Sequence, residues 1–306
     1  MTKIFIDGSA GTTGLRIRER LAQRDDITLL TLPDELRKDN NAKRQIINDS
    51  DITFLCLPDD AARESVSLVE NDHTVIIDTS TAHRTSDDFV YGMPELKDQR
   101  EKIKTAKRIA NPGCHASGFI ALVEPLTALG LIKKDAYLSC FSITGYSGGG
   151  KKMIREYEAQ GRDRLLFAPR MYALSQSHKH LPEMQMYTDL ENAPVFCPVV
   201  ADFYSGMQVT VPLFSKDLNG TLKDIKEAYQ SYYQGGLIRF EDTDEGGFLS
   251  SLKMEGRDDM TVSVYGSDKR MTLVSRFDNL GKGASGAAIQ NMNIVLGCDE
   301  AKGLCV

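Results

Sequence analysis

The sequence has little of three features, and each shortage excludes a class of protein. No apolar run approaches the roughly 18–20 residues that a membrane-spanning helix needs, so we expect no membrane span. Basic residues do not predominate: the formal net charge is -6, which gives no electrostatic support for nucleic-acid binding. The six cysteines form no C-x-x-C pair, so we expect free thiols in a reducing, cytoplasmic compartment rather than a disulfide framework.

The chain is long enough, at 306 residues, for two domains of ordinary size. Apolar residues make up 41% and charged residues 26%, which is typical of a globular protein. Residues 1–7 turn polar too soon for a secretion signal, and we expect them to form the first strand of a domain.

A glycine-rich turn joins this strand to residues 15–23, which have helical spacing. In that context glycines let the backbone approach a pyrophosphate, and the helix N-terminus receives its charge. The spacing is G-x-x-G-x-x-G rather than the standard G-x-G-x-x-G, and an ordinary strand-to-helix turn is the alternative. The predicted dinucleotide contacts are Gly8, Ser9, Gly11, Thr12, Thr13 and Gly14.

The end of the second predicted strand, residues 27–32, indicates which dinucleotide is bound. An NAD-binding domain usually carries an acidic residue there for the ribose hydroxyls, whereas this strand ends in Leu32 and acidic residues come only later. Arg37 and Lys38 then offer positive charge for a 2′-phosphate. We therefore predict NADP rather than NAD, with a solvated loop as the alternative reading of these two residues.

Strands and helices continue to alternate. Residues 51–57 and 74–78 are strand candidates, and residues 59–69 are a helix candidate. This order predicts a doubly wound parallel sheet, which binds ligands beyond the carboxyl ends of its strands. We expect Ser80 to contact the cofactor and Arg84 the substrate, with ordinary polar loop residues as the alternative.

The stretch from Asn111 to Gly118 places Cys114 just after a Pro-Gly turn and at the start of an apolar helix, which Gly130 is placed to end. Unpaired backbone N–H groups and the positive end of the helix dipole favour the thiolate, which is the nucleophilic form of cysteine. The alternative is that Cys114 is a small buried apolar side chain.

A second domain of α+β character is expected after this helix. Residues 136–143 form a strand that leads into the glycine-rich stretch 144–152, where Ser147 and two lysines can hold an anionic substrate. The P-loop spacing is absent, and a flexible hairpin loop is the alternative. Alternating apolar and polar residues predict antiparallel strands at 207–213, 260–265 and 271–277. A helix is expected between them at 222–233.

A polar cluster holds two of the five histidines, His178 and His180, which lie on one side of the chain if it is extended. No further His or Cys with ligand spacing is nearby, so we predict no metal. General acid/base work with Cys114 is favoured instead, because histidine titrates near neutral pH.

The last segment has small residues, among them Gly283, followed by an apolar helix at 287–296, which suggests close packing against the cofactor. The expected fold is α/β, with a Rossmann-type doubly wound NADP-binding domain and a second α+β domain built on an antiparallel sheet. The expected boundaries are 1–114 for the cofactor domain, 115–283 for the catalytic domain, and 284–306 for a C-terminal helix that returns to the cofactor domain.

Several stretches along nearly the whole chain resemble the short form of the N-acetyl-γ-glutamyl-phosphate reductase family of arginine biosynthesis. The motifs are Asn-Pro-Gly-Cys, His-Lys-His-x-Pro-Glu and Asn-Leu-Gly-Lys-Gly-Ala-Ser-Gly-Ala-Ala, and together they are specific. The matching stretches are 8–14, 75–84, 91–96, 111–114, 178–183 and 279–290.

The resemblance implies an NADP-dependent oxidoreductase related to aspartate-semialdehyde dehydrogenase and, more distantly, to glyceraldehyde-3-phosphate dehydrogenase. It implies that Cys114 is the nucleophile, His180 the acid/base, and His178 a substrate contact together with Glu183, although the order of the two histidines stays open. It also implies a small-molecule acyl-phosphate substrate and a homo-oligomer, either a dimer or a tetramer. The run at 79–84 and the residues after Cys114 depart from the long form of the family, which leaves the roles of His83 and His115 open.

The implied reaction reduces N-acetyl-γ-glutamyl phosphate to the semialdehyde and phosphate through a thioester on Cys114. The backbone N–H of Cys114 and the side-chain amide of Asn111 are the expected hydrogen-bond donors to the oxyanion. Two alternatives stay open: an aspartate-semialdehyde dehydrogenase, and a dinucleotide sensor that needs no reactive cysteine.

Overall fold

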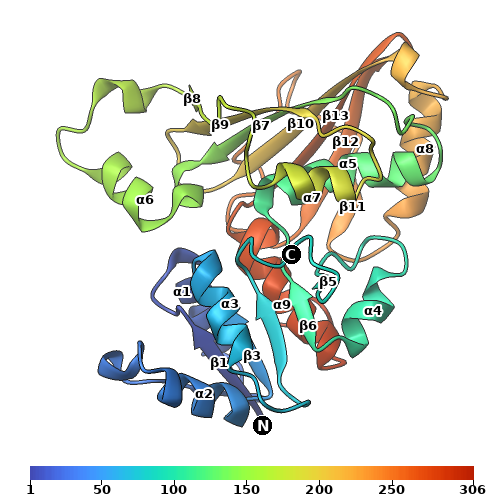
Figure 1. The fold of residues 1–306 in the computed structure, drawn as a ribbon. Coiled ribbons are helices and arrows are strands. Elements are labelled where there is room, and N and C mark those ends of the chain that lie inside the picture. Colours follow the sequence, from blue (N-terminus) through green and yellow to red (C-terminus); the bar gives the residue numbers. More distant parts are fainter. The chain divides into compact units, whose positions relative to one another are not determined.

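The computed structural model describes residues 1–306, which form two compact units (Figure 1). The first unit contains Met1–Pro112 and Ala284–Leu304, and the second contains Gly113–Gly283 and Cys305–Val306. The chain therefore passes between the units one residue before Cys114, again after Gly283, and a last time after Leu304. None of the helices combines the length and the apolar character that crossing a membrane requires.

The first unit is built on a six-stranded sheet in the order β2-β1-β3-β4-β6-β5, with every pair parallel. Its strands are β1 (Thr2–Asp7), β2 (Ile27–Leu30), β3 (Ile52–Leu55), β4 (Val75–Asp78), β5 (Val90–Tyr91) and β6 (Arg108–Ala110). Its helices are α1 (Thr12–Leu21), α2 (Asn40–Asp49), α3 (Asp59–Ser67), α4 (Gln99–Thr105) and α9 (Gly286–Val295), with a short 3-10 turn η1 (Asp34–Leu36).

Helices cover both faces of this sheet. Successive side chains of a strand point to opposite faces, so one strand contributes to two cores. Ile4 and Ile6 of β1 belong to a core shared with α1, α4 and α9. Phe5, between them, belongs to the core shared with α2 and α3. This confirms the predicted doubly wound parallel sheet, and the helix α9 near the end of the chain completes one of its layers.

The second unit has a seven-stranded sheet in the order β11-β12-β13-β10-β7-β9-β8. Its strands are β7 (Ser139–Gly145), β8 (Arg170–Met171), β9 (Val195–Ala201), β10 (Met207–Phe214), β11 (Ile238–Phe240), β12 (Met260–Ser267) and β13 (Arg270–Phe277). Its helices are α5 (Cys114–Ala128), α6 (Gly150–Glu158), α7 (Leu181–Met186) and α8 (Leu222–Tyr232). Shorter turns are η2 (Tyr146–Gly149), η3 (Arg164–Phe167), η4 (Ser215–Asp217) and the π-helical η5 (Gly281–Ser285), which spans the second crossing.

One prediction for this unit needs correction, and one alternative is excluded. The sheet is mixed rather than antiparallel, because β7 pairs with β9, and β11 with β12, in parallel. A long crossover separates β7 from β9, as parallel neighbours require. The glycine-rich stretch 144–152 is not a hairpin loop, since its residues form η2 and the start of α6.

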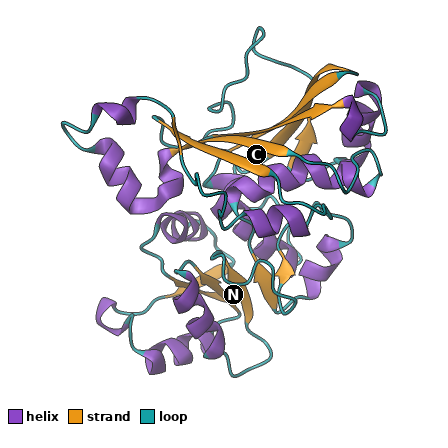
Figure 2. Ribbon diagram, turned by 45° about the horizontal axis from the view of Figure 1, so that its top comes forward, coloured by secondary structure: helices purple, strands orange, loops and turns teal.

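Helix α5 runs along one face of this sheet and is almost completely buried (Figures 1 and 2). It packs against β10 and β13, and the hydroxyls of Tyr229 and Tyr233 donate to the carbonyl oxygens of Leu122 and Ala121. Gly130 adopts a φ of +70° just beyond the helix, which agrees with its predicted role as a stop signal.

The close approach of α5 to the sheet predicts a loss of stability on changing Gly118→Ala. A Cβ there would lie 2.5 Å from Val209 and 2.8 Å from both Phe277 and Ser275. Alanine favours a helix over glycine by about 1 kcal/mol, whereas overpacking costs about 1–3 kcal/mol. Because three neighbours on two strands cannot all move away, we expect the free energy of unfolding to fall.

Urea denaturation measures this change, with Gly148→Ala as the matched control. A Cβ at Gly148 has no neighbour nearer than 3.5 Å, so that variant should keep the stability of the unmodified protein. Equal stability of the two variants would contradict the proposed packing.

Candidate active site

The glycine turn of the first unit forms a cradle that side chains would fill. Gly8 has a φ of +87°, and a Cβ there would lie 2.2 Å from the carbonyl oxygen of Cys56. A Cβ at Gly14 would lie 2.5 Å from the carbonyl oxygen of Gly8. Helix α1 starts at Thr12, after Gly11, and has no acidic residue in its first turn. This backbone geometry therefore suits the pyrophosphate of a dinucleotide, which a helix N-terminus attracts.

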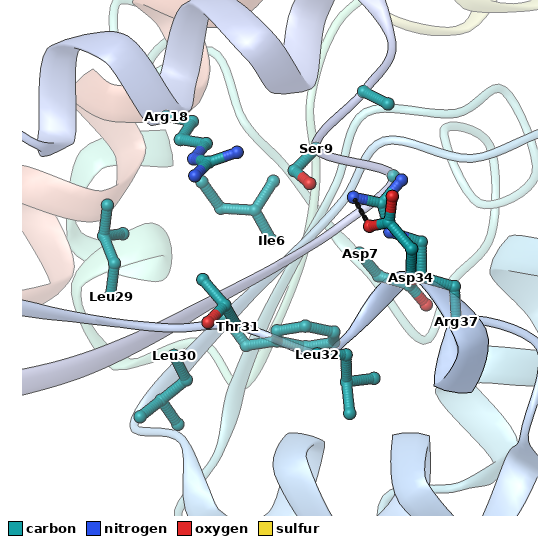
Figure 3. Close-up of a pocket in the computed structure, with 13 residues that line it drawn as sticks. Ile6, Asp7, Ser9, Arg18, Leu29, Leu30, Thr31, Leu32, Asp34 and Arg37 are labelled. Atoms are coloured by element: carbon teal, nitrogen blue, oxygen red, sulfur yellow. Dashed lines mark ion pairs between the residues drawn. The ribbon is translucent and has the colours of Figure 1, made fainter.

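A pocket opens beside this turn (Figure 3). Arg18 of α1 and Arg37 line it together with Ser9, and Arg37 forms a 2.7 Å ion pair with Asp34, which also lines it. The remaining lining residues are Phe5, Ile6, Asp7, Gly8, Ala10, Leu29, Leu30, Thr31 and Leu32.

Of the two predicted basic residues, Arg37 lines the pocket and Lys38 does not. Sequence reasoning missed Arg18, although a signal existed. Arg18 follows Gly14 by four residues, which places both on one side of α1. The pocket thus has two guanidinium groups, one from the helix and one from the segment after β2.

The loop after β4 is organised by a buried carboxylate. Asp78 accepts hydrogen bonds from the backbone N–H and the hydroxyl of Ser80, each 2.8 Å long, and its Oδ2 lies 2.6 Å from Nδ1 of His83. The His83 ring also stacks on Phe89 at 4.2 Å. Arg84 donates to the carbonyl oxygen of Thr79. Ser80 and Arg84 therefore make contacts within the loop, and His83 gains a structural explanation that the sequence left open.

The segment before Cys114 is fixed by a second set of polar contacts within the first unit. Asn111 donates from Nδ2 to the carbonyl oxygen of Ala284 at 3.1 Å. Asn291 of α9 donates to Oδ1 of Asn111 at 3.3 Å and to the carbonyl oxygen of Gly92 at 2.9 Å. A Cβ at Gly92 would lie 2.4 Å from the Asn291 amide, so this network needs glycine there.

In the second unit, Cys114 is the first residue of α5 and is half-buried. The N–H of Gly113, its N-cap, donates to Oε2 of Glu183 at 2.9 Å, and Glu183 is buried in α7. A Cβ at Gly283 would lie 2.9 Å from Cβ of Cys114, so Gly283 packs directly beside the cysteine. The dipole of the helix start favours a thiolate at this position.

Three histidine rings gather near this helix start. The ring centroids of His178 and His180 are 4.7 Å apart. The ring centroid of His115 lies 5.7 Å from that of His178 and 5.5 Å from that of His180. Phe196 packs against His115 and His178. His180 precedes α7 and is buried, whereas His178 is half-buried. The structure therefore brings together both predicted histidines.

Two side chains in or beside this cluster, His115 and Tyr172, were given no role in the sequence analysis. His115 lies 2.8 Å from Ser142 Oγ through Nδ1 and 2.8 Å from the Tyr172 hydroxyl through Nε2. Burial, with a smaller effect of His178, lowers the pKa of His115 to about 3. Burial, with a smaller effect of Cys114, raises the pKa of Tyr172. No short-range sequence pattern points to Tyr172. His115, in contrast, directly follows Cys114, and this position is a signal that the sequence contains.

Ser147, the predicted substrate contact after β7, is buried and accepts a 3.0 Å hydrogen bond from Nδ2 of Asn279. Asn279 in turn accepts from the N–H of Gly206. Nowhere does the structure gather three His, Cys, Asp or Glu side chains in the way that a metal site requires.

Comparisons with known proteins agree with this architecture. The family model described as "Semialdehyde dehydrogenase, NAD binding domain" matches residues 29–106, and "Semialdehyde dehydrogenase, dimerisation domain" matches residues 114–279. Aspartate semialdehyde dehydrogenase II of Vibrio cholerae, complexed with ASA, superposes with a TM-score of 0.74 at 15% identity, covering 97% of this chain and 98% of that one. The enzyme of Candida albicans, solved with NADP, gives 0.68 at 14% identity, covering 97% and 99%. The chain thus has the two-domain fold of the semialdehyde dehydrogenases.

Sequence similarity shows to which family within this fold class the chain belongs. A protein of Nostoc sp. named N-acetyl-gamma-glutamyl-phosphate reductase 2 is 44% identical, with 99% of each chain covered. Reductases of the same name from Chelativorans sp. and Brucella anthropi are 46% and 45% identical, with 96% of this chain and 98% of theirs covered. The chain belongs to the N-acetyl-gamma-glutamyl-phosphate reductase family, which confirms the resemblance inferred from its motifs.

The contact between Gly113 and Glu183 predicts that Glu183→Ala destabilises the protein. The variant leaves the Gly113 N–H without its buried acceptor, which costs about 1–3 kcal/mol. Glu183→Gln keeps a side-chain oxygen of the same reach and is the matched control. We expect the alanine variant to unfold at lower urea concentration than the glutamine variant, and equal midpoints would contradict a bond of this strength.

Proposed function

We propose that this chain catalyses the NADPH-dependent reduction of N-acetyl-γ-glutamyl phosphate to N-acetylglutamate semialdehyde and phosphate. The observation that carries the proposal is the position of Cys114 as first residue of α5, in a chain of this family and beside a cluster of histidines. A non-catalytic sensor would have no use for a cysteine in that position.

Cys114 begins the proposed reaction as a thiolate that attacks the acyl carbon of the substrate. Phosphate leaves, and an acyl thioester on Cys114 remains. NADPH, when bound, supplies the hydride that reduces the thioester carbon. The thiohemiacetal on Cys114 then collapses to the semialdehyde and releases the thiolate. The proposed reaction is reversible.

The negative oxygen of each tetrahedral species needs hydrogen-bond donors. We assign this role to the backbone N–H of Cys114 and to the amide of Asn111. His180 acts as the acid/base and His178 as a substrate contact, since His178 is the more exposed of the two rings. Ser147 and Arg84 stay predicted substrate contacts, while the bond from Gly113 makes Glu183 a support for the cysteine turn.

The coenzyme of this proposal is NADP(H), held by the backbone of the glycine turn. Arg18 and Arg37 support the choice, since both line the pocket and can pair with a 2′-phosphate. The ion pair of Arg37 with Asp34 is exposed, and such pairs contribute little, so a phosphate can displace it.

The proposed nucleophile also needs a compartment that keeps its thiol reduced, and we place the enzyme in the cytoplasm for that reason. A homo-oligomer is proposed as well. The description of the model matched by residues 114–279 as a dimerisation domain supports a dimer.

Replacing both pocket arginines tests the coenzyme. We expect the Arg18→Ala, Arg37→Ala variant to bind NADPH at least about tenfold more weakly, because a charged hydrogen bond contributes about 1.5–3 kcal/mol. Affinity for NADH should stay the same. Calorimetric titration measures both, and Lys38→Ala, which removes one positive charge from a residue that does not line the pocket, is the control for each single arginine replacement as well as for the pair. An equal loss in that control would show a general charge effect rather than a phosphate site.

Steady-state rates in the reverse direction, with phosphate and NADP, test the substrate. The acetylated substrate carries an amide where the aspartate compound carries an ammonium group, and an unpaired buried charge costs several kcal/mol. The aspartate compound is also one methylene shorter, so its carbonyl falls short of Cys114. We expect kcat/KM for acetylglutamate semialdehyde to exceed that for aspartate semialdehyde by at least about a hundredfold.

Comparable rates with the two semialdehydes would reject this assignment in favour of an aspartate-semialdehyde dehydrogenase. The Cys114→Ala variant separates enzyme from sensor: it should lose turnover with both compounds and still bind NADP. Substantial turnover in that variant would remove Cys114 from the mechanism.

A further inference from the structure

Three side chains of the second unit form a hydrogen-bonded row that no step of the proposed reaction uses. His115 is 3% exposed, and its two ring nitrogens lie 2.8 Å from the hydroxyls of Ser142 and Tyr172. Ser142 comes from β7, and Tyr172 directly follows β8. Each hydroxyl has one proton and can donate or accept, so the direction of both bonds depends on where His115 carries its proton.

The His115 ring is neutral at physiological pH, because burial lowers its pKa to about 3. A neutral imidazole donates from one nitrogen and accepts at the other. The row therefore has two arrangements. In one arrangement the hydroxyl of Ser142 has a proton left to donate to a group outside the row, and in the other the hydroxyl of Tyr172 has it.

Burial of the hydroxyls distinguishes the two arrangements. Ser142 is 0% exposed, and its hydroxyl makes no hydrogen bond other than the one to His115. With the proton on Nδ1 of His115, the Ser142 hydroxyl would be a buried donor with no acceptor, which proteins avoid. With the proton on Nε2, Ser142 donates to Nδ1, and the remaining proton belongs to Tyr172, which is only partly buried.

Tyr172 stands among the groups proposed for catalysis. Its ring centroid is 6.0 Å from that of His178, and a negative charge on Cys114 would raise the pKa of its hydroxyl. Its pKa is raised, so the phenol keeps its proton and serves as a donor. A donor in this place suits an acyl oxygen that becomes negative during the reaction.

We propose that His115, with its proton on Nε2, is a positioning residue that directs the hydroxyl proton of Tyr172 toward the acyl oxygen of the substrate on Cys114. The inference rests on the proposed function, because it assumes that Cys114 carries the acyl group. It makes Tyr172 a further hydrogen-bond donor of the reaction, and Ser142 the residue that selects the tautomer of His115.

The tautomer is measured without substrate or cofactor, by the nitrogen NMR spectrum of the histidine side chains in ¹⁵N-labelled protein. His115→Gln identifies the resonances of His115. We expect an unprotonated Nδ1 and a protonated Nε2. A protonated Nδ1 would overturn the proposal, whatever reaction the protein catalyses.

Kinetics of four variants tests the effect on the reaction. Loss of an oxyanion donor lowers kcat on the order of a hundredfold, and we expect that fall, with little change in KM, for Tyr172→Phe. His115→Asn keeps a polar group near Ser142 but loses the donor to Tyr172, so it should fall similarly. His115→Gln keeps an amide near the Nε2 position and should lose less.

The double variant, Tyr172→Phe with His115→Asn, should be no slower than Tyr172→Phe alone, because His115 acts only through Tyr172. Multiplicative losses would reduce His115 to a structural residue and overturn the proposal. If His115→Asn does not fold, Tyr172→Phe and the NMR spectrum still decide. An unchanged kcat in Tyr172→Phe, with Cys114→Ala inactive, overturns this inference alone, whereas turnover in Cys114→Ala overturns the proposed function.

Discussion

The hydrogen bond from the Asn111 amide to the carbonyl oxygen of Ala284 is the contact on which the end of the first unit, three residues before Cys114, depends. It joins the two segments by which the chain leaves the first unit and returns to it. In the second unit, Gly283 packs beside Cβ of Cys114. Within the second unit, the position of the cysteine is thus set by close packing against the backbone of Gly283, rather than by a surface loop. Such fixed geometry is what covalent catalysis needs, because small displacements of reacting atoms lower the rate strongly.

The two units use one physical device for two purposes. Helices α1 and α5 both begin after glycine, and neither has an acidic residue in its first turn. Both starts therefore present the positive end of a helix dipole to a negative group. At α1 that group is the proposed pyrophosphate, which comes from outside. At α5 it is the proposed thiolate of Cys114, which belongs to the helix itself.

The features that the sequence predicted are those set by neighbouring residues. The glycine turn before α1 and the placement of Cys114 at a helix start depend on residues within one or two turns. Missed features depend on contacts between distant segments. The parallel pairing of β7 with β9 is decided by the long crossover between them, and the bond between His115 and Tyr172 joins residues 57 positions apart. Arg18 lies between these extremes, since its helical spacing from Gly14 was visible, although its pocket was not.

The electrostatics of the histidine cluster follow from the different burial of its members. Three imidazole rings within 6 Å of one another cannot all be protonated, because like charges at that distance repel strongly where water is excluded. Burial keeps the His115 ring neutral, and both of its nitrogens are engaged with hydroxyls. The proposed proton exchange with a substrate is therefore left to His178 and His180, of which only His178 is partly open to solvent. A third histidine beside the proposed nucleophile thus adds hydrogen bonds to the site without adding a charge that would compete with the proposed acid/base for its proton.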